Sequence, residues 1–454
     1  MITFLSLGGA DEIGANCHYL NINGTGIILD CGMHPKKVGL DALPKFELLE
    51  DKPTDYVLIS HAHQDHLNGL PFLIKKFPHL KIITTPQTRA IAELTLRNAI
   101  NILKSQITEE SFSIYSYEEV DLLIKSIAYK SYNEEFNISS IHKAEDSETT
   151  AKFFDAGHII GSAGIMISCG DTQIFYTGDI NLTSQTLLEG ATLPSSKVNT
   201  LILECTYGAT DSSSLNTWES EVDLFVSSLN KVINNGGSVL VPVFALGKLQ
   251  EILATVHLQM LKGKLTNADI YTAGIGEKIN RVYDYNRYTV NRSEIELILH
   301  DINQKDLYTL NSTEDLFKYP SIVLASSGMM VESTISFMLA KRWLMQRQSA
   351  IFTVGYMDIE TPGYIVANAR KGDKIKLTES DKKCEIKCEI ENFNFSAHSK
   401  RGELLEIVKR LNPDNVLLVH GDPDAIDWMG ASIIKMKKGI RVYSTHAGKE
   451  LAFA

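Results

Sequence analysis

Features that mark membrane, secreted or disordered proteins are scarce in this sequence of 454 residues. No apolar run is long enough to span a membrane, and residues 1–5 lack the basic flank of a secretory signal peptide. The 6 cysteines are too few and too scattered for a disulfide framework. Low-complexity linkers and internal repeats are missing as well. We therefore expect a globular protein with no membrane association in a reducing compartment, the cytoplasm.

Positive charge is also scarce, because 44 Lys and Arg residues stand against 55 Asp and Glu residues, which gives a net charge of −11. A nucleic-acid-binding protein usually presents a basic surface. If this chain binds a nucleic acid, bound cations and a locally basic groove must supply the attraction. Most basic runs are solvated surface, and the densest one here offers only candidate contacts: Lys371, Lys374, Lys376, Lys382 and Lys383.

The length of the sequence indicates more than one domain, since a chain of this length is too long for one ordinary hydrophobic core. The first 200 or so residues alternate short apolar strands with amphipathic helices. Residues 238–354 alternate apolar strands with longer helices, which is typical of a parallel, three-layer α/β domain. The last stretch returns to the first pattern. We expect an α/β chain in which 1–207 and 379–454 form one domain and 208–378 is inserted into it.

The most informative segment is His-Ala-His-Gln-Asp-His at residues 61–66, which follows a buried-type strand at 56–60. Neutral imidazole and carboxylate are ligands that zinc prefers. On a loop after a strand, His61 and His63 can point to one side, and Asp65 and His66 can turn toward a second point nearby. This pattern predicts a two-metal site that activates water. A polar loop that is merely rich in histidine is the alternative, which 3 histidines in six positions disfavour.

Further polar residues follow predicted strands, where α/β folds collect catalytic groups. Each one alone is more readily a cap at the end of a strand. Their joint appearance in this order, around the histidine cluster, favours one shared site. They are Asp30, His158, Asp179, Glu204, His398 and His420.

These motifs resemble a known family. The segment 61–66, the Gly-His and Gly-Asp pairs that end at His158 and Asp179, and Asp30 are similar to the metal motifs of the metallo-β-lactamase superfamily. Three further motifs, at 204–208, 395–398 and 418–421, resemble those of the β-CASP nucleases, as do segments 237–250 and 325–330 of the insert. The resemblance covers nearly the whole chain. It implies a metallo-β-lactamase αββα sandwich with an inserted three-layer α/β β-CASP domain.

The resemblance also implies roles. Two zinc ions per chain would be bound, one by His61, His63 and His158, the other by Asp65, His66 and His420, with Asp179 bridging both. A metal-activated hydroxide would hydrolyse RNA phosphodiesters. Asp30 would orient a ligand imidazole, and His398 would act as general acid with its tautomer fixed by Glu204. Contacts to phosphate would come from three serines: Ser396, Ser326 and Ser327.

Several alternatives remain open. A DNA nuclease of the Artemis type usually carries valine at the position of His420. A small-molecule hydrolase of the glyoxalase II type lacks the insert and the His398 motif, and an inactive scaffold subunit loses metal ligands. Cys205 and Asp422 stand where the family usually has serine and glutamate, and residues 355–363 are looser than the family's glycine-rich turn. The absence of the extra domain of RNase J favours endonucleolytic cleavage of RNA, and a homodimer is an open expectation.

Overall fold

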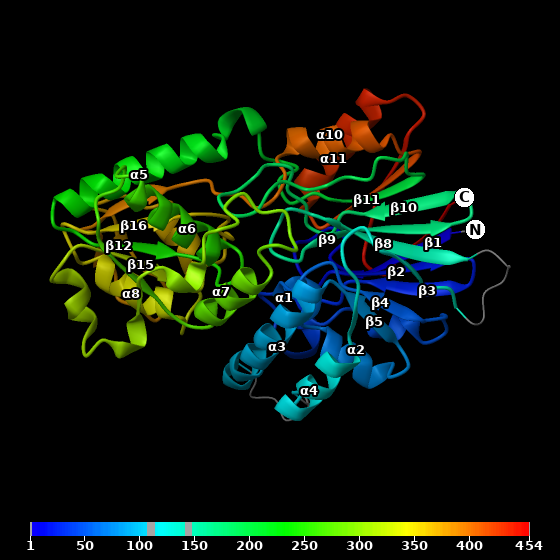
Figure 1. Cartoon of the computed structure of the whole chain (residues 1–454), viewed down its shortest axis with the longest axis horizontal. Helices are drawn as coiled ribbons and strands as arrows, with labels where there is room; N and C mark the ends of the chain where they lie inside the picture. Colours follow the sequence, from blue (N-terminus) through cyan, green and yellow to red (C-terminus); the bar gives the residue numbers. More distant parts are fainter. Residues whose placement is uncertain (1, 107–113, 141–147, 454) are drawn as a thin grey trace. The chain divides into compact units, whose positions relative to one another are not determined.

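The computed structural model describes residues 2–106, 114–140 and 148–453. The chain forms two compact units (Figure 1). Unit 1 comprises Met1–Thr183, Gly190–Ser212 and His398–Ala454, and unit 2 comprises Ser184–Glu189 and Ser213–Ala397. The chain therefore passes between the units four times.

Unit 1 contains, within its described residues, two sheets of seven strands each. The first sheet has the order β22-β1-β2-β3-β4-β5-β6, with bounds β22 Glu450–Phe453, β1 Ile2–Gly8, β2 Cys17–Ile22, β3 Thr25–Leu29, β4 Tyr56–Leu58, β5 Lys81–Thr84 and β6 Ala128–Tyr129. The second has the order β21-β20-β11-β10-β9-β8-β7, with bounds β21 Arg441–Ser444, β20 Asn415–Val419, β11 Thr200–Glu204, β10 Thr172–Tyr176, β9 Ala163–Cys169, β8 Thr149–Asp155 and β7 Glu135–Asn137.

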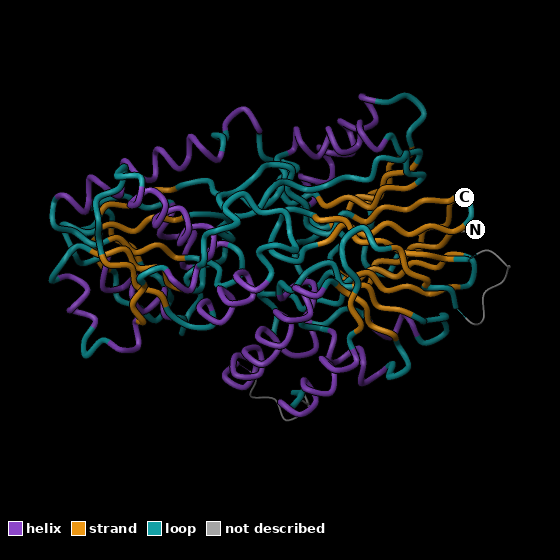
Figure 2. The backbone as a smooth tube through the Cα atoms, in the orientation of Figure 1, coloured by secondary structure: helices purple, strands orange, loops and turns teal. Residues whose placement is uncertain are grey.

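The two sheets of unit 1 pack face to face. Leu20 and Ile27 of the first sheet share one buried core with Ile165 and Ile202 of the second. Figure 2 shows the strands as the inner layers with the helices outside them. The helices are α1 Gln64–Leu67, α2 Leu70–Lys76, α3 Pro86–Gln106 and α4 Tyr117–Ser126, which lie near β4 and β5, and α10 Arg401–Leu411 and α11 Pro423–Met436, which lie near β11 (Figure 1). The predicted αββα sandwich is confirmed.

The position of strand β11 explains why its sequence is apolar between its two end residues. Every residue of β11 is buried. Ile202 points into the core between the sheets, whereas Leu201 and Leu203 belong to a second core with helices α10 and α11. A central parallel strand covered on both faces needs apolar residues at every position. Its polar end residue, Glu204, lies at the carboxyl edge, where the candidate site is found.

Unit 2 is built, over the part that the structure describes, around a six-stranded sheet of order β14-β13-β15-β12-β16-β19. All neighbouring strands pair in parallel. The strands are β12 Val239–Pro242, β13 Asp269–Thr272, β14 Gln304–Asp306, β15 Ser321–Ala325, β16 Ala350–Thr353 and β19 Glu389–Asn392, beside a small pair, β17 Lys374–Ile375 and β18 Cys384–Glu385. The helices are α5 Trp218–Asn234, α6 Lys248–Leu261, α7 Gly276–Tyr285, α8 Ile335–Trp343 and α9 Pro362–Ala367.

Helices cover both faces of this sheet. Phe337 and Trp343 of α8 pack on Leu240 and Val323 in one core, while α5 and α6 lie on the opposite side (Figure 1). The predicted three-layer α/β insert is therefore confirmed. None of the described helices is long and apolar enough to cross a membrane.

The division between the units differs from the boundaries expected from the sequence. Unit 2 begins its main span at Ser213 and continues to Ala397, whereas the sequence suggested 208–378. The extension follows from β19, whose residues Glu389–Asn392 pair with Ala350–Thr353 of β16. Strand β19 is short and largely polar, so its sequence does not predict a strand of this sheet.

Candidate metal centre

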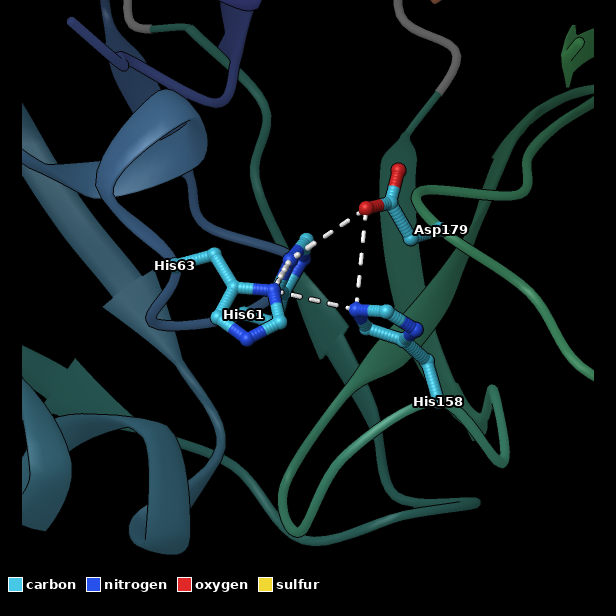
Figure 3. A group of neighbouring side chains, drawn as sticks. All are labelled: His61, His63, His158 and Asp179. Atoms are coloured by element: carbon cyan, nitrogen blue, oxygen red, sulfur yellow. Dashed lines mark hydrogen bonds and ion pairs between the residues drawn. The ribbon is translucent and has the colours of Figure 1, made fainter. Parts of the chain in front are cut away.

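The first cluster of unit 1 gathers four side chains from three strand ends. His61 and His63 follow β4, His158 follows β8 and Asp179 follows β10. One ligand atom of each lies within 4.8 Å of all the others, and Figure 3 shows the four side chains directed toward one another. Residues far apart in the sequence meet here because the strands end at one edge of the sandwich.

The atoms of this cluster fit a cation. His63 Nδ1 lies 3.1 Å from His61 Nε2 and 3.0 Å from His158 Nε2. Asp179 Oδ2 lies 3.6 Å from each of those two Nε2 atoms. A neutral imidazole has one N–H and one lone pair, so three converging ring nitrogens and a carboxylate cannot all be satisfied by protons. A divalent ion that prefers nitrogen and oxygen ligands satisfies all four.

A second cluster lies beside the first. Ligand atoms of Asp65, His66 and His420 are all within 4.8 Å of one another. Asp65 Oδ2 lies 3.7 Å from His66 Nε2 and 3.3 Å from His420 Nε2. His66 belongs to α1, and His420, with a φ of 51°, directly follows β20. This donor set also suits a divalent ion.

Asp179 faces both clusters with different oxygens. Its Oδ2 faces the first cluster, and its Oδ1 lies 3.3 Å from His66 Nε2 and 2.9 Å from His420 Nδ1. Despite these neighbours, Oδ1 is buried without a hydrogen bond of acceptable geometry among the described residues. A buried acceptor left in this state carries a desolvation cost. A cation between the clusters would remove that cost.

Asp30 fixes the orientation of two imidazoles. It is fully buried and accepts hydrogen bonds from Ser60 N at 2.6 Å, Ser60 Oγ at 2.7 Å and Tyr176 OH at 2.7 Å. His66 Nδ1 lies 2.8 Å from Asp30 Oδ2 and therefore donates to it. Because Ser60 Oγ donates its proton to Asp30, it accepts from His61 Nδ1 at 3.0 Å. Both histidines thus present the lone pair of Nε2 to the clusters.

The electrostatics of the site reflect its crowded charges. Burial, together with the neighbouring imidazoles, holds the pKa of His61 well below its usual value. Burial opposes the charged form of His420 too, but Asp179 and Asp65 raise its pKa to about 10. The same carboxylates and Asp30 raise the pKa of His66 against the effect of burial. Without a cation, the carboxylates therefore draw protons onto these two rings, and a metal ion would displace them.

His398 lies next to the clusters and is paired with Glu204. Its Nδ1 lies 3.0 Å from Glu204 Oε1, and its ring centroid is 4.5 Å from that of His158. Glu204 is 1% exposed and also accepts from Ile180 N and Thr206 N at 3.0 Å each. Burial lowers the His398 pKa, but the charge of Glu204 outweighs this effect and raises it. Glu204 therefore favours the protonated form of His398.

Sequence reasoning missed several polar partners of the site. They include Ser60, Tyr176 and Thr206, whose contacts cross between strands, and Asn16, whose Nδ2 lies 3.0 Å from His66 Nε2. Asn16 follows the segment Gly8–Ala15 and carries no motif of its own. A signal for Ser60 existed in its position directly before His61.

The serines expected to contact phosphate lie in unit 2. Ser326 and Ser327 follow β15, and Ser327 Oγ accepts from Val331 N at 3.1 Å. Ser396 lies near the end of the span that closes unit 2. Phosphate binding by these serines stays a prediction. In the lysine run, Lys371 forms an exposed ion pair with Glu389 at 2.6 Å, so its ammonium group already has a carboxylate partner.

Comparison with known families identifies three consecutive domains. Residues 19–205 match the metallo-β-lactamase superfamily domain, 249–365 the Beta-Casp domain, and 383–445 the Zn-dependent metallo-hydrolase RNA specificity domain. The matches follow the two units, since the first and third models fall mainly on unit 1 and the second on unit 2.

Relatives match along nearly the whole chain. Cleavage and polyadenylation specificity factor 73 of Drosophila melanogaster is 30% identical over 92% of this chain and 59% of its own length. The Integrator complex subunit 11 homolog of Dictyostelium discoideum is 28% identical over 97% of this chain and 60% of its own. Endoribonuclease YSH1 of Saccharomyces cerevisiae is 28% identical over 95% of this chain and 56% of its own. The chain thus spans a little over half the length of these relatives.

A solved structure shares the fold. A protein of unknown function from Enterococcus faecalis V583 superposes with a TM-score of 0.59 at 13% identity and covers 99% of both chains. The three domain matches, the relatives and the order of the site motifs agree. The chain belongs to the β-CASP family of the metallo-β-lactamase superfamily.

Proposed function

We propose that this protein is a metal-dependent ribonuclease that cleaves RNA endonucleolytically and uses two zinc ions per chain. The observation that carries the proposal is Asp179, whose two oxygens face two separate clusters of imidazole and carboxylate ligands. The relatives named endoribonuclease and the RNA specificity model over residues 383–445 support RNA as the substrate.

The ligands divide between the two ions. His61, His63 and His158 would hold one ion and Asp65, His66 and His420 the other, with Asp179 shared. Two divalent ions, when bound, lower the pKa of a water molecule and neutralise charge that develops on a phosphate. Asp30 keeps the Nε2 atoms of His61 and His66 directed at the site through Ser60 and its own hydrogen bond.

His398 would supply the proton that the leaving group needs. In the hydrolysis, water loses one proton to solvent, its oxygen forms a bond to phosphorus, and the bond between phosphorus and the 3′ oxygen breaks. The leaving 3′ oxygen takes a proton from His398. Glu204 accepts from Nδ1 of His398, so the opposite ring nitrogen, Nε2, can present the proton. The two backbone donors to Glu204 hold this carboxylate in its orientation toward His398.

Further features bear on substrate and context. His420 lies at a position where DNA nucleases of the Artemis type usually carry valine, which favours RNA. Ser396, Ser326 and Ser327 are proposed contacts to the phosphate backbone. Six free cysteines fit a reducing compartment, the cytoplasm. A homodimer stays a prediction, which sedimentation of the purified chain would test.

A digest of paired substrates tests the proposal. A 5′-blocked RNA and a DNA of the same sequence would be incubated with the full chain, with and without a chelator. We expect internal cleavage of the RNA, little cleavage of the DNA, loss of activity with the chelator and recovery when zinc is restored. Cleavage of DNA alone, or of RNA in excess chelator, would refute the proposed function.

A further inference from the structure

The first turn of α6 carries two buried charged side chains that the proposed chemistry does not use. Lys248 is 8% exposed and Glu251 is 1% exposed. Residues three apart lie on one face of a helix, so the two act together. Burial lowers the pKa of Lys248 to about 8 and raises that of Glu251 to about 7. Buried charge is costly unless it is partnered, so the partners of this pair reveal its role.

Glu251 binds the short segment 184–189, through which the chain first enters unit 2. Its Oε2 accepts from Leu187 N at 2.7 Å and its Oε1 from Leu188 N at 3.2 Å. Trp218 Nε1 also donates to Thr186 Oγ1 at 3.0 Å. The segment begins shortly after Asp179 in the sequence.

Lys248 binds the segment through which the chain finally leaves unit 2. Its ammonium group donates to the carbonyl oxygen of Phe395 and lies 5.3 Å from the ring centroid of Trp218. The ring of Phe395 packs against Trp218 and Phe225 at centroid distances of 5.0 Å and 5.4 Å. Only Ser396 and Ala397 separate Phe395 from His398, where unit 1 resumes.

The unit 1 ends of the same two segments are hydrogen-bonded to each other. Ser399 N donates to Ile180 O at 2.7 Å, and Leu182 N donates to Ser399 Oγ at 3.0 Å. Ile180 N donates to Glu204 Oε1, the oxygen that also meets His398 Nδ1. The pair of His398 and Glu204 is therefore held by chain segments whose other ends are anchored on α6.

We propose that Lys248 and Glu251 are positioning residues that hold both segments in unit 2 and so keep His398 aligned for proton transfer. This inference rests on the proposed function. Proton transfer requires hydrogen-bond distance, and a misplacement of about 1 Å can cost roughly 10²-fold in rate. A loosened anchor at Phe395 would act on leaving-group protonation without touching a metal ligand.

Lys248→Met tests the inference in the full chain, because methionine keeps an unbranched apolar stem without the ammonium group. We expect kcat on ordinary RNA to fall roughly 10- to 100-fold, with KM and metal content unchanged. RNA with a 3′-bridging phosphorothiolate, whose sulfur leaves without a proton donor, should recover most of the loss. Lys248→Arg keeps the charge and a donor and should recover part of it. Lys262→Met, at the exposed end of the same helix, is the matched control and should behave as wild type.

Each outcome decides the question. Wild-type rates in folded Lys248→Met would overturn the inference, and so would equal losses on both substrates, which indicate a merely structural role. If that variant does not fold, Glu251→Gln replaces it, because the amide keeps one acceptor oxygen and should give a smaller loss of the same pattern. A wild-type chain that does not cleave RNA would refute the proposed function, and the inference with it. If the activated substrate rescues His398→Ala but Lys248→Met cleaves ordinary RNA at the wild-type rate, the inference is refuted and the proposed function stands.

Discussion

Around Asp179 in unit 1, imidazole nitrogens and carboxylate oxygens face one another, and the site holds more hydrogen-bond acceptors than donors. In unit 2, Lys248 and Glu251 are as deeply buried, yet each meets partners that the chain supplies. Burial alone therefore does not mark a metal site. What separates the two regions is the balance of donors and acceptors, and only the first requires a cation from outside.

Asp179→Asn should have the largest effect, because the amide keeps the shape of the side chain but loses the charge shared by both clusters. We expect cleavage of RNA to fall roughly 10³-fold or more, together with loss of bound metal measured by elemental analysis. Asp171→Asn, in the exposed turn between β9 and β10, is the control and should keep both. Full activity in the Asp179 variant would show that the clusters do not act as one site.

His398→Ala should separate activity from metal binding. A general acid contributes roughly 10²–10⁴ in rate, so ordinary RNA should be cleaved that much more slowly while both metals stay bound. The basic limb of the pH–rate profile should disappear, because raising the pH through the His398 pKa removes the proton that wild type donates. Glu204→Gln should show a milder loss. Loss of metal in His398→Ala would instead make this residue a ligand.

Ser60→Ala should weaken metal binding without removing a ligand. The hydroxyl links Asp30 to His61, and partners of this kind change metal affinity by roughly 10- to 100-fold. Competition with a chelator of known affinity would measure the change. Ser168→Ala, in β9 of the same unit, is the control. An unchanged metal affinity would mean that Asp30 orients His66 but does not orient His61 through Ser60.

The charge pair of unit 2 should show the smallest effect, a pH dependence of stability. Glu251 has its pKa raised in the folded state to about 7, so its contribution is full below pH 4.5 and is lost as the pH rises through 7. Lys248 has its pKa lowered to about 8, so its contribution is full above pH 10.5 and is lost as the pH falls through 8. Both contributions are therefore at their lowest between pH 7 and 8.

Hydrogen exchange of the α6 amides would measure this dependence. Relative to Lys248→Met/Glu251→Gln, the opening free energy of wild type should dip between pH 7 and 8 by roughly 1–3 kcal/mol, since one pKa unit corresponds to about 1.4 kcal/mol. A difference that does not vary with pH would contradict the pKa values of the pair. Removing metal should leave these amides unchanged and should speed exchange near His61 in unit 1.

The sequence predicts the fold class and nearly all of the residues that cluster around Asp179, because local sequence patterns indicate both. Alternating apolar strands and helices indicate α/β layers, and His61, His158 and Asp179 each stand at a strand end. The partners Ser60, Tyr176 and Asn16 do not follow from such patterns, since their contacts depend on which strands pair across the sandwich. The unit boundary at Ala397 depends in the same way on the pairing of β19 with β16. Lys248 and Glu251 look like ordinary residues of a helix surface until the tertiary structure buries them.

Zinc titration of the metal-free chain, with cleavage of a 5′-blocked RNA followed at each step, would show whether two bound ions activate this site. We expect no cleavage by the metal-free protein, and activity that rises with zinc and saturates near two equivalents per chain. Asp179→Asn should show no such response. Cleavage by the metal-free chain, or saturation with zinc without any cleavage of RNA, would show that the two clusters are not the centre of a metal-dependent ribonuclease.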